Sequence, residues 1–195
     1  MTVHYGRLGF LDRLRGLAVL LMFLDHGLLL WLTLDPGQDL RGDLRATVTR
    51  FSMPLFMVVS GFFLERTSRR RARMIALVAA GLAPILWFTW PEFSQPEILA
   101  LWVLGFSLRT VLERFPLETI VLGVLQILHL PVGWPGYEPG LVAVFLAVGV
   151  LARHRPESLE RLGRPLPGWF AWFGRRSLLL YCGHLLVIAG SLAIR

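Results

Sequence analysis

Four ionisable side chains in the first long apolar run of the sequence could support chemistry. Asp12 and Arg15 stand near the start of this run, and Asp25 and His26 stand further along it. Arg15 and His26 are eleven positions apart, which in an α-helix is a rotation about 20° from a whole number of turns and a rise of about 16 Å. We therefore expect both side chains on one helix face. Imidazole is a natural base there, because its neutral form tolerates burial and it exchanges protons near neutral pH.

The two aspartates have different relations to that face. Asp12 lies one turn before Arg15 and could pair with it. Asp25 is turned by about 100° from His26, so we expect it to meet another helix rather than to orient its neighbour. In the simplest interpretation, Arg15 reaches lipid headgroups and a neighbouring helix satisfies His26. In the functional interpretation, the face links a membrane boundary to a buried base and suits transfer from a soluble anionic donor.

Two further places carry polar groups in apolar surroundings. Ser177, Tyr181 and His184 follow the spacing i, i+4, i+7 and should share a face of the last apolar run. Hydrogen bonding between helices would explain them without catalysis. Ser60 and Gly61 would let another backbone approach closely, which helix packing alone explains.

A basic loop follows the second apolar run. Residues 67–73 contain four arginines, among them Arg70 and Arg73. Guanidinium groups bind phosphates well, but a cluster of positive charge on the inner side of a membrane would look the same.

Composition excludes an ordinary soluble domain. Of 195 residues, 55% are hydrophobic and only 17% are charged, and the mean hydropathy is +0.60. All 20 basic residues are arginine, and the net charge is +7. Because these arginines flank apolar runs, a membrane protein explains them better than nucleic-acid binding does. The single Cys182 allows no internal disulfide, and no metal-ligand spacing is present.

Apolar runs recur along the whole chain and predict one all-α, polytopic transmembrane domain over residues 1–195. We expect no cleavable signal peptide, because the first run is too long and lacks a small-residue cleavage site. Runs of about 14–16 residues are short for a bilayer crossing, so the number of spans could differ by one or two. The seven predicted spans are 9–34, 47–64, 74–90, 97–112, 117–132, 139–152 and 168–194.

The distribution of arginine predicts the orientation of these spans. With the N-terminus in the cytoplasm, all but four of the 20 basic residues fall on the inner side. The four outer ones are Arg41, Arg45, Arg50 and Arg195. This asymmetry favours an inner N-terminus and an outer C-terminus. Pro84 should kink the third span or end its outer turn.

The segment LDRLRGLAVLLMFLDH at residues 11–26 resembles the first helix of the transmembrane acyltransferase superfamily. This superfamily includes integral-membrane enzymes that O-acetylate bacterial polysaccharides, together with relatives of heparan-alpha-glucosaminide N-acetyltransferase and of the pilin-acetylating TraX proteins. Its hallmark is an arginine followed after ten residues by a histidine, and Arg15 and His26 fit it.

Other segments are similar to the same superfamily, and the resemblance covers about half of the chain. The better-known members have more spans than the seven predicted here. The similar segments are 51–56 with the Ser-Gly-Phe at 60–62, the basic loop at 70–73, and the terminal Gly-x-x-Ser at 174–177 with Tyr181 and His184.

The resemblance implies transfer of an acyl group, most often acetyl, from cytoplasmic acyl-CoA to a hydroxyl or amine. His26 would be the general base that deprotonates the acceptor, or a transient acyl carrier. Arg15, with Arg70 and Arg73, would bind the phosphates of the donor. Acyl-CoA would be a substrate, and no permanently bound cofactor is expected. The supporting candidates around this site are Asp12, Ser60, Ser177, Tyr181 and His184.

The expected location is the bacterial inner (cytoplasmic) membrane, with the lipid bilayer as the main partner. A membrane-protein partner or an oligomer is left open. Two alternatives to catalysis are an accessory subunit of a membrane complex that keeps only the acyltransferase architecture, and a small-solute or proton transporter.

Overall fold

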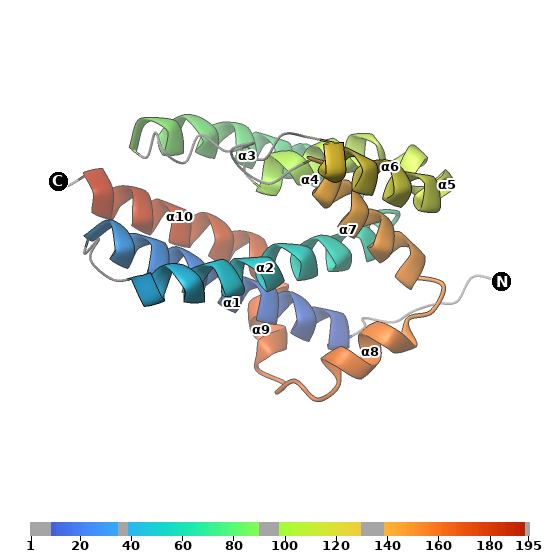
Figure 1. The fold of residues 1–195 in the computed structure, drawn as a ribbon, viewed down its shortest axis with the longest axis horizontal. Helices are drawn as coiled ribbons and strands as arrows, with labels where there is room; N and C mark the ends of the chain where they lie inside the picture. The colour runs from blue at the N-terminus through green and yellow to red at the C-terminus, as the bar shows by residue number, and fades with distance from the viewer. Residues whose placement is uncertain (1–8, 35–38, 90–97, 130–138, 194–195) are drawn as a thin grey trace. The chain divides into compact units, whose positions relative to one another are not determined.

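The computed structural model describes residues 9–34, 39–89, 98–129 and 139–193. These residues form α-helices and no strand (Figure 1). The predicted all-α class is therefore confirmed for the described part of the chain. The helices are α1 (Gly9–Leu34), α2 (Asp39–Phe62), α3 (Arg69–Thr89), α4 (Ile98–Ser107), α5 (Arg109–Arg114), α6 (Pro116–His129), α7 (Pro139–Ala152), α8 (Glu157–Gly163), α9 (Phe170–Arg175) and α10 (Ser177–Ala193).

Several helices follow the predicted apolar runs closely. α1 and α7 have the bounds predicted for the first and sixth spans. α2 and α3 begin before their apolar runs, because polar turns extend them at the N-terminal end. In α3 this extension is capped: the Ser68 hydroxyl accepts a hydrogen bond from the Arg71 backbone N–H at 3.2 Å.

Two predicted spans are each divided into two helices. The run 97–112 forms α4 and α5, which meet at Leu108. Just before this break the Ser107 hydroxyl donates to the Val103 carbonyl at 2.9 Å, a back-bond that often bends helices. The run 168–194 forms α9 and α10, which meet at Arg176 with φ −107° and ψ 14°. Neither run therefore forms a single unbroken helix.

Proline explains the boundary between α5 and α6, but the proline inside α3 does not end that helix. Phe115, between α5 and α6, has φ −133° and ψ 56°, because the ring of the following Pro116 disfavours helical backbone before it. Pro84 lies inside α3, which continues to Thr89. Pro84 therefore does not end α3, and the kink expected as the alternative stays a prediction.

Within the described residues, no helix has both the length and the apolar composition needed to cross a bilayer. The number of spans and their orientation stay predictions.

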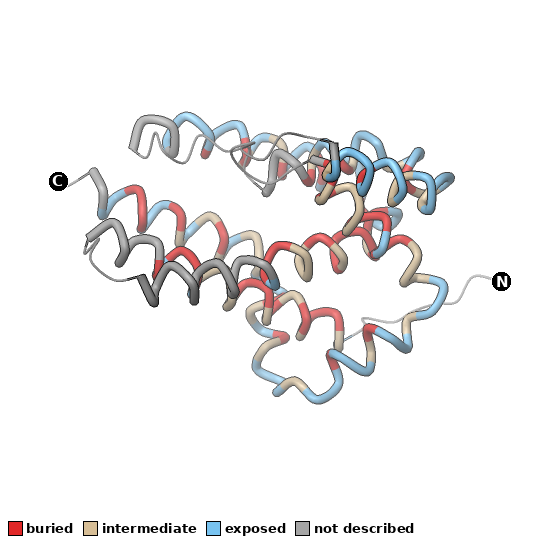
Figure 2. Tube along the Cα trace, in the orientation of Figure 1, coloured by how far each residue is buried: buried red, intermediate tan, exposed pale blue. Residues whose placement is uncertain are grey.

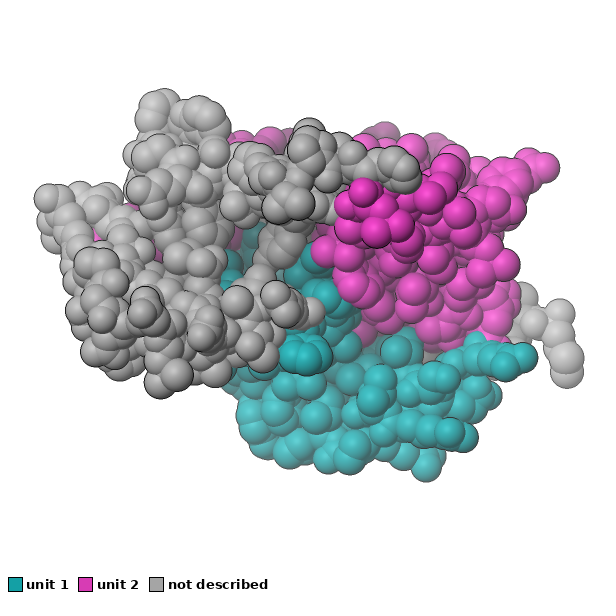
Figure 3. All heavy atoms as spheres, viewed as in Figure 1, with its two compact units in different colours: residues 1–56, 155–181 teal, residues 57–154, 182–195 magenta. Residues whose placement is uncertain are grey.

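The chain divides into two compact units (Figure 3). The first contains residues 1–56 and 155–181, and the second contains residues 57–154 and 182–195. The organisation as one domain stays a prediction.

In the first unit, α1 packs against α8 and α9. The Arg13 guanidinium donates to the carbonyl oxygens of Arg164 and Leu166 at 2.9 and 3.0 Å, which fixes the chain between α8 and α9. On α2, the buried Ser52 hydroxyl donates to the Ala18 carbonyl of α1 at 3.1 Å. The start of α1 is thus held by segments far away in the sequence.

In the second unit, the end of α2 lies against α7. A Cβ at Gly61 would overlap the carbonyl oxygen of Leu146, and a Cβ at Gly149 would overlap that of Val58. These glycines let the two backbones approach closely, as the pair Ser60 and Gly61 predicts. Figure 2 shows buried residues concentrated along this contact.

Candidate active site on the first helix

Helix α1 carries three buried ionisable side chains. Asp12, Asp25 and His26 are buried, and Arg15 is half-buried. Because α1 runs unbroken from Gly9 to Leu34, Arg15 and His26 keep the spacing that places them on one face. The segment therefore supplies the shared face that the sequence predicts, while the catalytic roles of its residues stay predictions.

The structure places Asp25 beside His26. Asp25 Oδ2 lies 3.8 Å from His26 Nε2, and the two side chains are only 5% and 9% exposed. The polar ends of the two side chains therefore lie close together, and the expected contact of Asp25 with another helix stays a prediction. Consecutive Cβ atoms diverge on a helix, but both side chains are long enough for their polar ends to converge. The separation is longer than a hydrogen bond, and it is short enough for a substantial electrostatic interaction when both groups are charged.

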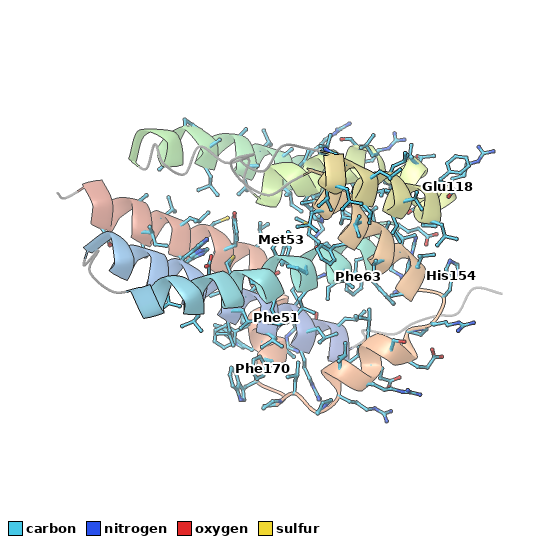
Figure 4. The ribbon with its side chains drawn as sticks, in the orientation of Figure 1. Phe51, Met53, Phe63, Glu118, His154 and Phe170 are labelled. Carbon is cyan, nitrogen blue, oxygen red and sulfur yellow. The ribbon has the colours of Figure 1, made fainter. Side chains whose placement is uncertain are left out.

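The first turns of α1 are fixed by a close approach of α9. A Cβ on Gly16 would overlap the carbonyl oxygen of Phe170, and a Cβ on Gly174 would overlap that of Asp12. Phe170, labelled in Figure 4, begins α9. The first unit thus brings together two segments that resemble the superfamily and lie far apart in the sequence. One contains Arg15 and Gly16, and the other contains Gly174 of the terminal motif.

The remaining members of the terminal motif lie on α10. Ser177 is half-buried and Tyr181 is buried in the first unit, and His184 is half-buried in a part of α10 that belongs to the second unit. α10 is continuous over all three residues, so they keep the spacing that predicts one face. A catalytic role for any of them stays a prediction.

The predicted phosphate-binding arginines are divided between the two units. Arg15 belongs to the first unit, whereas Arg70 and Arg73 are exposed in the first two turns of α3 in the second unit. A joint phosphate site formed by all three stays a prediction. Ser60 is buried in the second unit, and the close packing of the adjacent Gly61 on α7 accounts for this pair structurally.

Three features of the two units were not found in the sequence. The first is the approach of Asp25 to His26, and the second is the contact of Gly16 with α9. A glycine inside a helix is costly, so Gly16 was a signal of close packing. The third is Arg153, which hydrogen-bonds Glu65 and lies 3.8 Å from Glu113 Oε1. The contacts of Gly16 and of Arg153 join residues that are far apart in the sequence, so their partners cannot be identified from a short motif.

In chemical terms, α1 offers a buried imidazole next to a carboxylate, with a guanidinium on the imidazole's side of the helix. This combination suits proton transfer close to an anionic substrate. The described residues contain no group of three or more His, Cys, Asp or Glu side chains that could hold a metal ion.

Comparison with known protein families gives a match. Residues 8–90 match a family described as an acyltransferase domain. No curated protein matches the chain, and no solved structure matches it. The matched range includes Arg15, His26, Ser60, Arg70 and Arg73, and it supports acyl transfer as the general activity. Over residues 8–90 the chain is therefore similar to this membrane acyltransferase family, and the resemblance seen in its sequence is confirmed there.

Proposed function

We propose that the protein is a membrane acyltransferase that moves an acyl group, most simply acetyl, from cytoplasmic acyl-CoA to a hydroxyl or amine. His26 acts as the general base for the acceptor. The observation that carries this proposal is the buried His26, which lies beside a carboxylate inside the range that matches an acyltransferase domain. A buried imidazole shielded from water is suited to removing the acceptor's proton.

The surface of the described residues supports a lipid environment. Large apolar side chains are widely exposed on α3, α6 and α10, including Leu77, Leu128 and Leu179 at 69%, 72% and 70%. Figure 2 shows this exposure along much of α6. Apolar surface of this extent is unfavourable in water, whereas the ionisable Asp25 and His26 are buried. We place the protein in the bacterial inner membrane, with the lipid bilayer as its partner.

Arg15 is proposed to bind the phosphates of the donor, together with Arg70 and Arg73. Guanidinium groups bind phosphate through two parallel hydrogen bonds. Arg70 and Arg73 are exposed, so a soluble donor could reach them. Asp12, Ser60, Ser177, Tyr181 and His184 are proposed to support the site indirectly.

The test is an acetyl-transfer assay with labelled acetyl-CoA and purified protein in lipid nanodiscs. His26→Ala should lower turnover by about 100-fold or more, which is typical for loss of a general base. The matched control is His154→Ala, because His154 is exposed in the second unit (Figure 4) and should not affect turnover. Full activity in His26→Ala would contradict the proposal.

An accessory subunit is the second candidate, because the family match ends at residue 90 and α6 exposes apolar side chains that a partner protein could cover. It predicts that the wild-type protein neither binds CoA nor transfers acetyl, and that it purifies in a stable complex with another membrane protein.

A further inference from the structure

Asp25 is a buried carboxylate for which the proposed reaction has no role. It is 3% exposed, and its Oδ2 lies 3.8 Å from Nε2 of His26. A carboxylate removed from water is strongly unfavourable unless other groups compensate it. Its position places a second ionisable group directly beside the proposed base.

We propose that Asp25 is a positioning residue for His26. Its carboxylate restrains the imidazole ring and stabilises the positive charge that the ring acquires when it takes a proton. This inference rests on the proposed function. It gives a role to Asp25, which neither the spacing of Arg15 and His26 nor the resemblance to the superfamily assigned to it.

The role follows from the balance of the reaction. His26 takes the proton of the acceptor O–H or N–H as the acceptor's electron pair forms a bond to the thioester carbonyl carbon. The carbon–sulfur bond then breaks, its electron pair leaves on the CoA sulfur, and the imidazolium returns the proton to that sulfur. Asp25 stays ionised throughout. Positive charge exists on His26 only between the two proton transfers, so a fixed negative charge at 3.8 Å favours this interval over the resting state.

The distance agrees with such a role in a protein without substrate. Contacts between catalytic groups are often long in the absence of substrate and shorten when it binds. Asp25 and His26 are consecutive residues of one unbroken helix, so the backbone fixes their relative positions and only side-chain rotation is needed to shorten the contact.

The test compares Asp25→Asn with Asp25→Glu in the same nanodisc assay. Asp25→Asn keeps the shape of the side chain but removes its charge, so kcat should fall by about 10- to 100-fold while KM for acetyl-CoA stays unchanged. Asp25→Glu restores the charge and should keep kcat within about tenfold of wild type. The matched control is Glu118→Gln, an exposed carboxylate on α6 (Figure 4), which should behave as wild type.

Several outcomes would overturn the inference. The inference is overturned if Asp25→Asn folds and its kcat is unchanged. It is also overturned if the affinity of Asp25→Asn for CoA falls as much as its kcat, because that result indicates a structural role. If Asp25→Asn does not fold, Asp25→Glu decides: a folded variant as inactive as His26→Ala would overturn it, and a variant that keeps activity supports it. If Asp25→Asn is active and His26→Ala is inactive, the role of Asp25 is disproved and the proposed function stands. Lack of transfer in the wild type, or full activity in His26→Ala, removes the proposed function and the inference together.

Discussion

Burial distinguishes the ionisable residues of α1 from the arginines of the loops. Asp12, Asp25 and His26 are buried, whereas Arg70, Arg73 and the other arginines at the start of α3 are exposed. Exposed arginines in a positive loop need no specific partner. Buried ionisable groups do, so α1 is the segment in which single substitutions should affect chemistry most directly.

Arg15→Lys should weaken donor binding more than it affects folding. Lysine keeps the charge but loses the planar group that forms two parallel bonds to phosphate, and we expect an affinity for CoA about tenfold lower, a cost of about 1.4 kcal/mol. Isothermal titration with CoA measures this. Arg161→Lys, at an exposed position on α8 in the same unit, is the control. Equal affinity in Arg15→Lys and wild type would remove Arg15 from the donor site.

At the scale of elements, glycines set close helix contacts within each unit. Gly16 and Gly174 bring α1 and α9 together in the first unit, and Gly61 and Gly149 bring α2 and α7 together in the second. Small residues at such contacts are typical of helices that pack in lipid, because a close approach of backbones increases van der Waals contact.

Gly16→Ala should destabilise the first unit, by about 1–3 kcal/mol, because its Cβ would overlap the Phe170 carbonyl oxygen. Gly27→Ala is the matched control in the same helix, since no atom of the described residues lies within 4 Å of its added Cβ. Alanine there should be neutral, or stabilising by up to about 1 kcal/mol. Thermal unfolding in detergent measures both, and equal melting temperatures for the two variants would contradict the close contact of α1 with α9.

Arg153→Gln should destabilise the second unit by about 1–3 kcal/mol. It removes the cation next to Glu113, whose Oε1 is buried without a hydrogen-bond partner among the described residues. Arg164→Gln is the control, because Arg164 pairs with Glu160 at 3.0 Å on an exposed helix surface, where such a pair contributes less than about 0.5 kcal/mol. Denaturation curves that are alike for the two variants would show that Glu113 does not depend on Arg153.

For the whole molecule, the units combine segments distant in the sequence. The first unit joins residues 1–56 to residues 155–181, so α1 cannot reach its packed state before α8 and α9 have been synthesised. Both ends of the chain that resemble the superfamily contribute to this unit. The proposed site therefore depends on the C-terminal part of the chain as well as on the matched range 8–90.

The intact protein should behave as an integral membrane protein. Exposed apolar side chains on α3, α6 and α10 would aggregate in water, so the protein should stay in the membrane pellet after alkaline carbonate extraction. A reporter fused after Arg195 should be active outside the cytoplasm, as the asymmetry of arginine predicts. Release into the carbonate supernatant would contradict membrane insertion, and a reporter active in the cytoplasm would contradict the orientation.

The sequence by itself determined the all-helical class, the bounds of α1 and α7, and the shared face of Arg15 and His26, because helical periodicity is a local property that composition and spacing express directly. Tertiary structure decided the breaks at Leu108 and Arg176, the convergence of Asp25 on His26, and the contact of Gly16 with α9. Side-chain rotation and the meeting of distant helices depend on packing around each residue, which no local pattern encodes.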